Sequence, residues 1–546
     1  MKFKFSNLKN NSYIYIFFFL YFLIGLLIYK DYGLSFDEEV HRENGFISLK
    51  YIFDFFNISY DFSNVTQLIS GEIPEITNDW RKTYGVAFDL PMAALEILIG
   101  FNDTRDVYIF RHLMTFLIFF LSTICFFYLL KLNYKSNILC IICVLFLILS
   151  PRIFAQSFYN SRDIVFLSLI IFTSYFSLKS LHQDKIKYII LSALFASLAT
   201  NTRILGCYLP VLTIFFYFLN CNHYSILKKT LKFSFIYIFF FSFFLFISWP
   251  YLWENPIGNF VGALSEFSKY PYNPYILYLG DYIKANFVPW HYFFVWFLIS
   301  TPIIFTILII VGLFYVFKVL LLNFIKISEK NSFLLWKNNN EMNEIFVLFI
   351  FLVPISLVIF LNSTLYTGWR HLYFIYPFLI FISGKGISVL ISLSNKILKK
   401  LIYLTIFIQI FFVINFLILN HPVQAVYFNS FSKKMVKDLF FYDYWGVGNK
   451  VTLNKLLSSN KYKEPITISA SSFTDLNKTK LIMEKKDRDR FVYLGIDKSK
   501  ADFIFTNYYY NLPPKTDIKY SIPSNYESIL KLEIGGLVIN EIFKKK

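Results

Sequence analysis

The sequence has little charge, few cysteines and few arginines. Of its 546 residues only 16% are charged, whereas 56% are hydrophobic. A soluble domain carries about 25% charged residues, so a single water-soluble globule is excluded, and the same counts exclude a disordered chain. The five cysteines all lie at or before residue 221, in or beside apolar segments, which argues against a disulfide framework. No Walker motif, dinucleotide fingerprint, zinc-protease motif or nucleophile elbow occurs in a suitable context.

The apolar residues come in long blocks. A bilayer is crossed by about 20 apolar residues, and the blocks predict an α-helical polytopic membrane protein with about eleven spans. The segments 187–201 and 204–220 are separated by only Thr202 and Arg203 and are also consistent with one bent unit. The predicted spans are 13–30, 107–130, 137–152, 164–180, 187–201, 204–220, 233–250, 291–317, 345–362, 371–393 and 401–420.

The basic residues predict the orientation of these spans. With the N-terminus in the cytoplasm, the six short loops on that side carry 18 lysines and four acids, as the positive-inside rule requires. The first loop on the opposite side, residues 31–106, has 14 acidic and 5 basic residues. The net charge of +18 therefore reflects mainly topogenic lysine, and no nucleic-acid partner is expected. We expect a multi-pass protein of the bacterial inner membrane with a periplasmic C-terminus.

Two parts of the chain are predicted. Residues 1–420 form a transmembrane domain, whose first periplasmic loop, 31–106, contains the amphipathic segments Gly45–Phe56 and Asp89–Ile99. Residues 421–546 alternate strand-like pieces, such as Ile466–Ala470 and Phe503–Asn507, with helical runs such as Asn449–Leu457. This pattern predicts a small C-terminal α/β domain.

Arginine is confined to one side of the predicted membrane. The six cytoplasmic loops contain none of the ten arginines, all of which map to the outer side. Arginine keeps its charge and binds phosphate or carboxylate through two parallel hydrogen bonds, which lysine cannot do. Arg203 and Arg370 lie at membrane mouths and are the candidates for an anion site. The alternative is that outer positions merely escape the cytoplasmic preference for lysine.

Acidic residues mark two further positions on that side. Asp37, Glu38 and Glu39 stand together after the first span, and adjacent carboxylates raise one another's pKa, as a general base or a cation site requires. Asp163 opens the fourth span, and between residues 107 and 253 the only other acid is Asp184. Ionisable groups at membrane depth are costly and usually functional. The alternatives are a solvated acidic loop and a helix N-terminal acid favoured by the dipole.

The arrangement of these charged residues and spans along the chain resembles the GT-C superfamily of polytopic glycosyltransferases. Within that superfamily it looks most similar to the branch of protein O-mannosyltransferases and lipid A aminoarabinose transferases. The resemblance covers about residues 13–420. The features that carry it are Asp37-Glu38 in a long first outer loop, the Asp163 segment, the Thr202-Arg203 turn and the Arg370-containing opening of a late span.

The resemblance implies transfer of one sugar from a polyprenyl-phosphate carrier to an acceptor on the outer face, with inversion. Asp37 would be the base that deprotonates the acceptor hydroxyl, with Glu38 and Asp163 orienting the acceptor or tuning Asp37. Glu39 adds a third carboxylate, so the base stays open among the three. Arg203, Arg370 and His371 would hold the donor phosphate. No cofactor or metal is assigned. Further candidates for substrate contacts are His41, Arg42, Tyr84, Arg162, Trp290 and His291.

Two other function classes fit the spans. A transporter or lipid flippase usually places its ionisable groups near the bilayer centre and shows internal repeats, whereas here the charges lie at one face. A non-catalytic component of cell-envelope polysaccharide assembly would not need two carboxylate sites facing arginines. The sugar is not identified by the sequence, and the acceptor is left open among a lipid, a polysaccharide and a protein.

Overall fold

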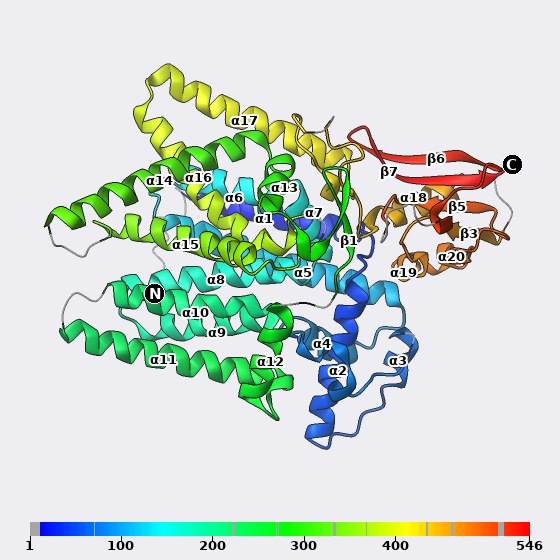
Figure 1. The fold of residues 1–546 in the computed structure, drawn as a ribbon, viewed down its shortest axis with the longest axis horizontal. Coiled ribbons are helices and arrows are strands. Elements are labelled where there is room, and N and C mark those ends of the chain that lie inside the picture. The colour runs from blue at the N-terminus through cyan, green and yellow to red at the C-terminus, as the bar shows by residue number, and fades with distance from the viewer. Residues whose placement is uncertain are drawn as a thin grey trace.

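The structure is a computed structural model that describes residues 11–69, 71–220, 224–268, 270, 272–330, 335–366, 368–432, 435–459, 464–510 and 518–546. A bundle of long helices fills one part of the molecule, and a small sheet with its helices projects from one end of that bundle (Figure 1). The predicted fold class, an α-helical membrane protein with a small α/β domain, is confirmed. The division at residue 420 stays a prediction.

The bundle contains the predicted spans. Among the described residues, seven helices are long and apolar enough to cross a membrane, an eighth span results if the bent pair α6–α7 is counted, and three apolar helices are shorter. The bundle helices are α1 (Ser12–Ile28), α5 (Thr104–Lys131), α6 (Asn137–Ile148), α7 (Pro151–Tyr159), α8 (Asp163–His182), α9 (Ile186–Thr202), α10 (Tyr208–Leu219), α11 (Tyr224–Ser248), α13 (Tyr292–Ser300), α14 (Ile303–Lys330), α15 (Asn339–Phe360), α16 (Tyr376–Leu393) and α17 (Lys396–Leu419).

Proline corrects the limits of two predicted spans. The span predicted at 137–152 is two helices, α6 and α7, bent by 67° at Ser150-Pro151. The span predicted at 291–317 is interrupted at Thr301, whose backbone is extended before Pro302. A residue that precedes proline is disfavoured in helical geometry, whereas proline itself suits the first turn of the next helix. Between α9 and α10 the chain is likewise broken, because Arg203 is extended (φ −142°, ψ 126°).

Close helix approach depends on glycine where α14 crosses α16. A Cβ at Gly312 would lie 2.1 Å from the carbonyl oxygen of Ile382, and one at Gly386 would lie 2.3 Å from that of Leu308. Helix pairs in membranes commonly use small residues in this way, since packing rather than hydrophobic burial drives their association. The two glycines therefore fix the spacing of the helices that follow Arg370 and Pro302.

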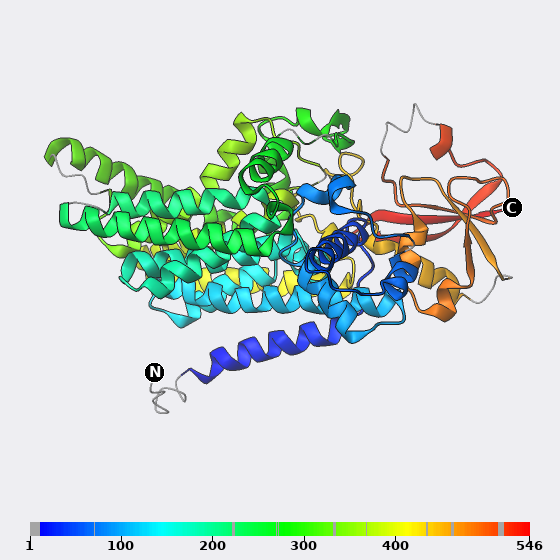
Figure 2. The same cartoon turned by 90° about the horizontal axis from the view of Figure 1, so that it is seen from below.

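The long first loop folds against the end of the bundle. It contains α2 (Glu38–Phe55), α3 (Ser63–Ile69) and α4 (Asp89–Ile99), so both predicted amphipathic segments are helices. Seen from below, this loop lies between the bundle and the C-terminal sheet (Figure 2). The same end carries α12 (Pro256–Ser268), the hairpin β1 (Tyr275–Tyr278) and β2 (Asp281–Lys284), and η7 (Arg370–Ile375). Over the described residues, the remaining 3-10 helices are η2 (Ile76–Asn78), η3 (Trp80–Thr83), η4 (Ile204–Cys207), η5 (Pro250–Leu252), η6 (Ala285–Phe287), η8 (Gln424–Val426) and η10 (Ile518–Tyr520).

The C-terminal domain is a five-stranded sheet in the order β4-β3-β5-β7-β6. Its strand β3 pairs in parallel with β4 and β5, and the hairpin β6–β7, which the sequence did not predict, continues the sheet antiparallel. Apolar side chains of α18 pack on it around Phe503 and Ile542. The elements are α18 (Val447–Ser458), β3 (Ile466–Ala470), α19 (Leu476–Lys480), α20 (Lys485–Arg488), β4 (Phe491–Tyr493), β5 (Phe503–Thr506), β6 (Tyr526–Ile534) and β7 (Leu537–Lys545).

The predicted cytoplasmic loops meet at the other end of the bundle. Asn133 donates to Glu344 at 3.0 Å, and His182 is 2.8 Å from Asn343, so loops far apart in sequence share one surface. At the opposite end, Arg488 of the C-terminal domain donates to Asp103 of the first loop at 2.9 Å. The predicted partition of the loops into two faces agrees with these contacts.

Candidate active site

Asp163 lies at the centre of a charged cluster at the domain end of the bundle. It is the first residue of α8 and is 2% exposed. Its backbone N–H donates to the Asn160 side chain at 2.9 Å, and the Asn160 amide donates back to the carboxylate at 2.9 Å. Arg203 donates to one carboxylate oxygen, and Arg370 lies 3.4 Å from the other. The helix N-terminus and two guanidinium groups thus stabilise a buried negative charge.

Arg370 connects this buried acid to Asp37. Its Nη1 is 3.0 Å from the Asp37 carboxylate, and its side chain is 6% exposed. Asp37 immediately precedes α2, and its side chain is 30% exposed. The fold therefore assembles the row Asp37–Arg370–Asp163–Arg203 from four distant segments. Of the two carboxylates, only that of Asp37 is reachable from solvent.

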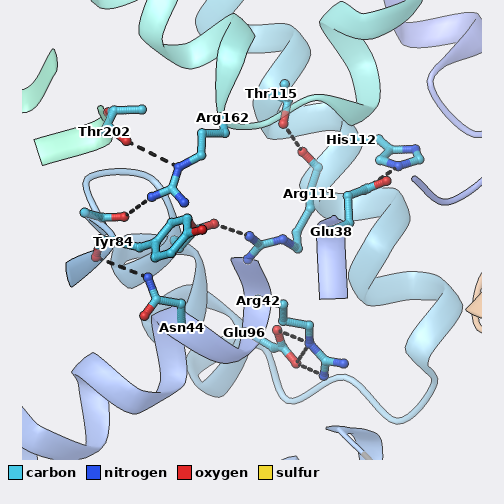
Figure 3. A network of polar contacts seen from close by, with 12 residues as sticks. Glu38, Arg42, Asn44, Tyr84, Glu96, Arg111, His112, Thr115, Arg162 and Thr202 are labelled. Atoms are coloured by element: carbon cyan, nitrogen blue, oxygen red, sulfur yellow. Dashed lines mark hydrogen bonds and ion pairs between the residues drawn. The ribbon is translucent and has the colours of Figure 1, made fainter. Parts of the chain in front are cut away.

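The neighbouring acids point elsewhere. Glu38 is buried, accepts the Ser35 N–H at 2.7 Å, and lies 2.9 Å from the His112 ring (Figure 3). Glu39 pairs with Lys478 of the C-terminal domain at 3.1 Å. Glu38 therefore anchors the start of α2 to α5, and Glu39 anchors it to the C-terminal domain, while Asp37 faces the arginines.

Arg370 is also enclosed by aromatic rings. Its guanidinium lies 4.7 Å from the centre of the Trp445 ring, 5.2 Å from that of Tyr366 and 6.0 Å from that of Tyr444. Such rings attract a cation through their electron-rich faces. The sequence did not predict this enclosure, because Tyr444 and Trp445 come from the tail, far from Arg370 along the chain.

Arg162 occupies the other side of the cluster. Its guanidinium lies 4.6 Å from the centre of the Tyr84 ring and donates to the carbonyl oxygens of Gly85 at 2.7 Å and Thr202 at 3.3 Å (Figure 3). Gly85 is required there, since a Cβ would lie 1.1 Å from the carbonyl oxygen of Asn201. The predicted candidates Tyr84 and Arg162 are thus in contact with each other.

Two histidines lie close by. His371 follows Arg370 in η7, and its ring is 4.7 Å from that of Tyr366. His41 lies one turn into α2 and is 9% exposed. Burial, followed by the guanidinium groups of Arg162 and Arg111, holds the pKa of His41 well below its usual value. His41 is therefore neutral at pH 7 and available as a hydrogen-bonding group.

Three predicted candidates have other surroundings. Arg42 donates to Glu96 and to the Leu68 carbonyl, so it ties α2 to α4 within the first loop (Figure 3). His291 is 2.7 Å from the Tyr278 hydroxyl in the β1–β2 hairpin. Trp290 is 67% exposed, with its ring against His291. Arg42 and His291 thus make structural contacts, and Trp290 lies on the surface. None of these contacts is with Asp37 or Asp163.

Several arginine nitrogens of the cluster have no partner. Within the part of the chain that the structure describes, Arg162 Nη1, Arg203 Nε and Arg370 Nε are buried without a hydrogen bond. A buried donor left unpaired costs about 1–3 kcal/mol, and more if it is charged. An oxyanion bound among these arginines would remove that cost. Among the described residues, no group of three or more His, Cys, Asp or Glu has the arrangement of a metal site.

Asp443 should make the stability of the protein depend on pH. It immediately precedes Tyr444 and Trp445, whose rings enclose Arg370. Burial raises its pKa to about 6 from an ordinary 3.8, although its carboxylate accepts the N–H groups of Gly448 and Val447. The folded state therefore binds this proton more tightly than the unfolded state. The proton on Asp443 therefore stabilises the folded state by about 3 kcal/mol. This stabilisation is fully present below about pH 4 and is lost as the pH rises through about 6.

We expect Asp443→Asn to remove this component. Thermal unfolding of the purified full chain between pH 4 and pH 7.5 measures it, with the difference between wild type and variant cancelling the other titrating groups. An identical pH slope in both proteins would contradict the assignment.

One comparison with known proteins matches part of the chain. Residues 92–249 match the family model of dolichyl-phosphate-mannose-protein mannosyltransferases. The matched segment contains Asp163 and Arg203 and lies between Asp37 and Arg370. The resemblance to this kind of glycosyltransferase, which the sequence suggested, is confirmed there.

Two crystal structures of ArnT from Cupriavidus metallidurans are also similar to this chain. The structure bound to undecaprenyl phosphate has 10% sequence identity and a TM-score of 0.45, and the match covers 97% of this chain and 98% of that chain. The apo structure has 10% identity and a TM-score of 0.49, with 98% of each chain covered. No curated protein sequence matches this chain.

Proposed function

We propose that this protein is a glycosyltransferase that moves one sugar from a polyprenyl-phosphate carrier to an acceptor hydroxyl. The observation that carries the proposal is the placement of a solvent-reachable carboxylate, Asp37, directly against arginines with unpaired buried donors. A base and an anion site side by side are what a single displacement at an anomeric carbon needs. The mannosyltransferase family match supports the same reaction class.

In the proposed reaction, Asp37 accepts the proton of the acceptor hydroxyl. The hydroxyl oxygen forms a bond to the anomeric carbon as the bond from that carbon to the phosphate oxygen breaks. The electron pair leaves with polyprenyl phosphate, and the displacement inverts the anomeric configuration. Arg203 and Arg370 stabilise the phosphate charge, which is largest as the bond breaks, so these interactions accelerate the reaction rather than merely bind the donor.

The other residues of the cluster have supporting roles. Asp163 holds Arg203 and Arg370 in place through its two oxygens. His371 lies beside Arg370. Its ring donates a further hydrogen bond to the phosphate when the nitrogen that faces the phosphate carries the hydrogen. Arg162 and Tyr84 line the part of the site that holds the donor sugar. Glu38, tied to His112, positions the start of α2 and is not the base.

We further propose that the site faces the periplasm of a bacterial inner membrane. The lysine-rich loops lie at the far end of the bundle and the C-terminal domain beside the site, which matches a cytoplasmic N-terminus under the positive-inside rule. A carrier lipid lying in the membrane explains why no nucleotide motif is needed.

Reconstituted protein tests both proposals at once. With donor carrying a labelled sugar and membrane glycolipids as acceptors, we expect label in the acceptor fraction and a matching amount of free polyprenyl phosphate. Donor presented on the side of the C-terminal domain should support transfer, whereas donor confined to the opposite leaflet should not. Movement of intact donor across the bilayer without release of polyprenyl phosphate would instead favour the lipid flippase.

A further inference from the structure

A groove lies between the residue before Asp37 and the C-terminal domain. It has a volume of about 370 Å³, and its lining residues come from both parts. Small-molecule sites commonly have about 300–1,000 Å³ and combine apolar walls with a few polar groups. The residues used below are Phe36 from the first loop and Ser472, Phe473, Thr474, Lys478 and Ile496 from the domain.

The groove opens where parallel-sheet domains usually bind ligands. Strand β3 ends at Ala470, is flanked in parallel by β4 and β5, and continues directly into Ser472, Phe473 and Thr474. In open α/β sheets, ligands bind outside the carboxyl ends of such strands. The topology thus predicts a ligand at this position from the fold of the domain alone.

The groove shares a corner with the proposed active site. Phe36 is 38% exposed, and its ring lies 6.2 Å from that of Phe473. Lys478 lies 4.2 Å from the centre of the Phe36 ring and pairs with Glu39 at 3.1 Å. The groove thus contacts the residue before Asp37, and its Lys478 pairs with Glu39, two residues after Asp37.

We propose that this groove binds the carbohydrate end of the acceptor and presents one of its hydroxyls to Asp37, an inference that rests on the proposed transferase function. Arg203 and Arg370 come from the helical bundle and take the donor phosphate in the proposed reaction, so we place the acceptor on the side of the C-terminal domain. A sugar ring has an apolar C–H face and a polar rim. The aromatic rings of Phe36 and Phe473 match the face, and the partly exposed side chains of Thr474 and Lys478 match the rim.

A peptide acceptor fits this groove less well. One recurring way of binding an extended peptide is to add it as a strand to an exposed sheet edge. The edge strand on this side of the sheet, β4, has only three residues, Phe491–Tyr493. The short edge and the aromatic walls favour a saccharide over a polypeptide backbone.

Blocking the groove tests the proposal. Ile496 lies on its lining and is 54% exposed, so Ile496→Trp adds bulk there without disturbing a core. We expect at least a tenfold increase in KM for the glycolipid acceptor, with unchanged transfer of the donor sugar to water. The matched control is Val492→Trp, since Val492 is 41% exposed on β4 and does not line the groove. Phe473→Ala, which removes one aromatic wall, should give the same selective loss.

Direct binding separates this inference from the proposed function. Methyl glycosides of hexoses and N-acetylhexosamines, titrated against the full-length protein by saturation-transfer NMR, should bind wild type and the Val492→Trp variant but not Ile496→Trp. If wild type transfers no sugar yet shows this binding pattern, the transferase proposal fails and the carbohydrate groove stands. Three results would overturn the assignment of the groove to carbohydrate. The acceptor KM of Ile496→Trp could be unchanged, or the variant could lose transfer to water as strongly as transfer to the acceptor. The wild type could also transfer sugar to unglycosylated Ser/Thr peptides, with Ile496→Trp abolishing that activity.

Discussion

Replacing Asp37 by asparagine is expected to lower the rate of sugar transfer by about 10²–10⁴-fold, the usual contribution of a general base. The amide keeps the size of the side chain and a hydrogen-bond acceptor toward Arg370, but it cannot take the acceptor proton. Donor binding should therefore change little, while kcat falls. The measurement is transfer of labelled sugar by reconstituted protein, together with equilibrium binding of the donor.

Two further variants make this result specific. Asp54→Asn alters an exposed carboxylate of the same helix, α2, and should leave the rate unchanged. Glu38→Gln should lower thermal stability through its bond to His112 while retaining much of the activity per folded molecule. Full activity in Asp37→Asn, or loss of activity in Glu38→Gln with normal stability, would move the base to another residue.

Arg370→Lys is expected to reduce kcat by about 10²–10³-fold, the range seen when a donor to a developing negative charge is removed. Lysine keeps the positive charge but has a single point of attachment, so it cannot bridge Asp37, Asp163 and a phosphate at once. The assay is the same transfer reaction, with release of polyprenyl phosphate measured in a single turnover. An unchanged single-turnover rate would exclude Arg370 from the phosphate site.

Arg370→Ala separates chemistry from stability. It leaves the buried Asp163 with Arg203 as its remaining cationic partner, and breaking a buried ion pair in this way typically costs about 3–5 kcal/mol. We expect a lower unfolding temperature for Arg370→Ala than for Arg370→Lys. Arg490→Lys is the matched control, because Arg490 pairs with the half-exposed Glu464 and should tolerate the exchange in both measurements.

The candidate site was only partly predictable, for a physical reason. Asp37, Asp163, Arg203 and Arg370 were selected because charge is rare near these spans and therefore stands out. Their mutual contacts were not predictable, since helices far apart in sequence approach one another through packing that leaves little periodic trace. Arg42 shows the limit of the charge criterion: it is adjacent to the acidic run yet binds Glu96 within the first loop.

Contacts from the tail were missed for the same reason. Tyr444 and Trp445 lie in the tail, and only the fold brings their rings to the guanidinium group of Arg370. His112, inside an apolar span, carried no signal for its contact with Glu38.

The sequence by itself determined the class of protein, the order and approximate positions of the membrane helices, the strands β3 and β5, and the separation of lysine from arginine. These features follow from local hydrophobicity, proline and charge, which act over short stretches of chain. Only the tertiary structure decided that Asp37 alone of its three acids faces Arg370, that Asp163 is held by two arginines, and that a groove joins the C-terminal domain to the active site. Those facts depend on close packing between distant segments, and no short stretch of sequence contains that information.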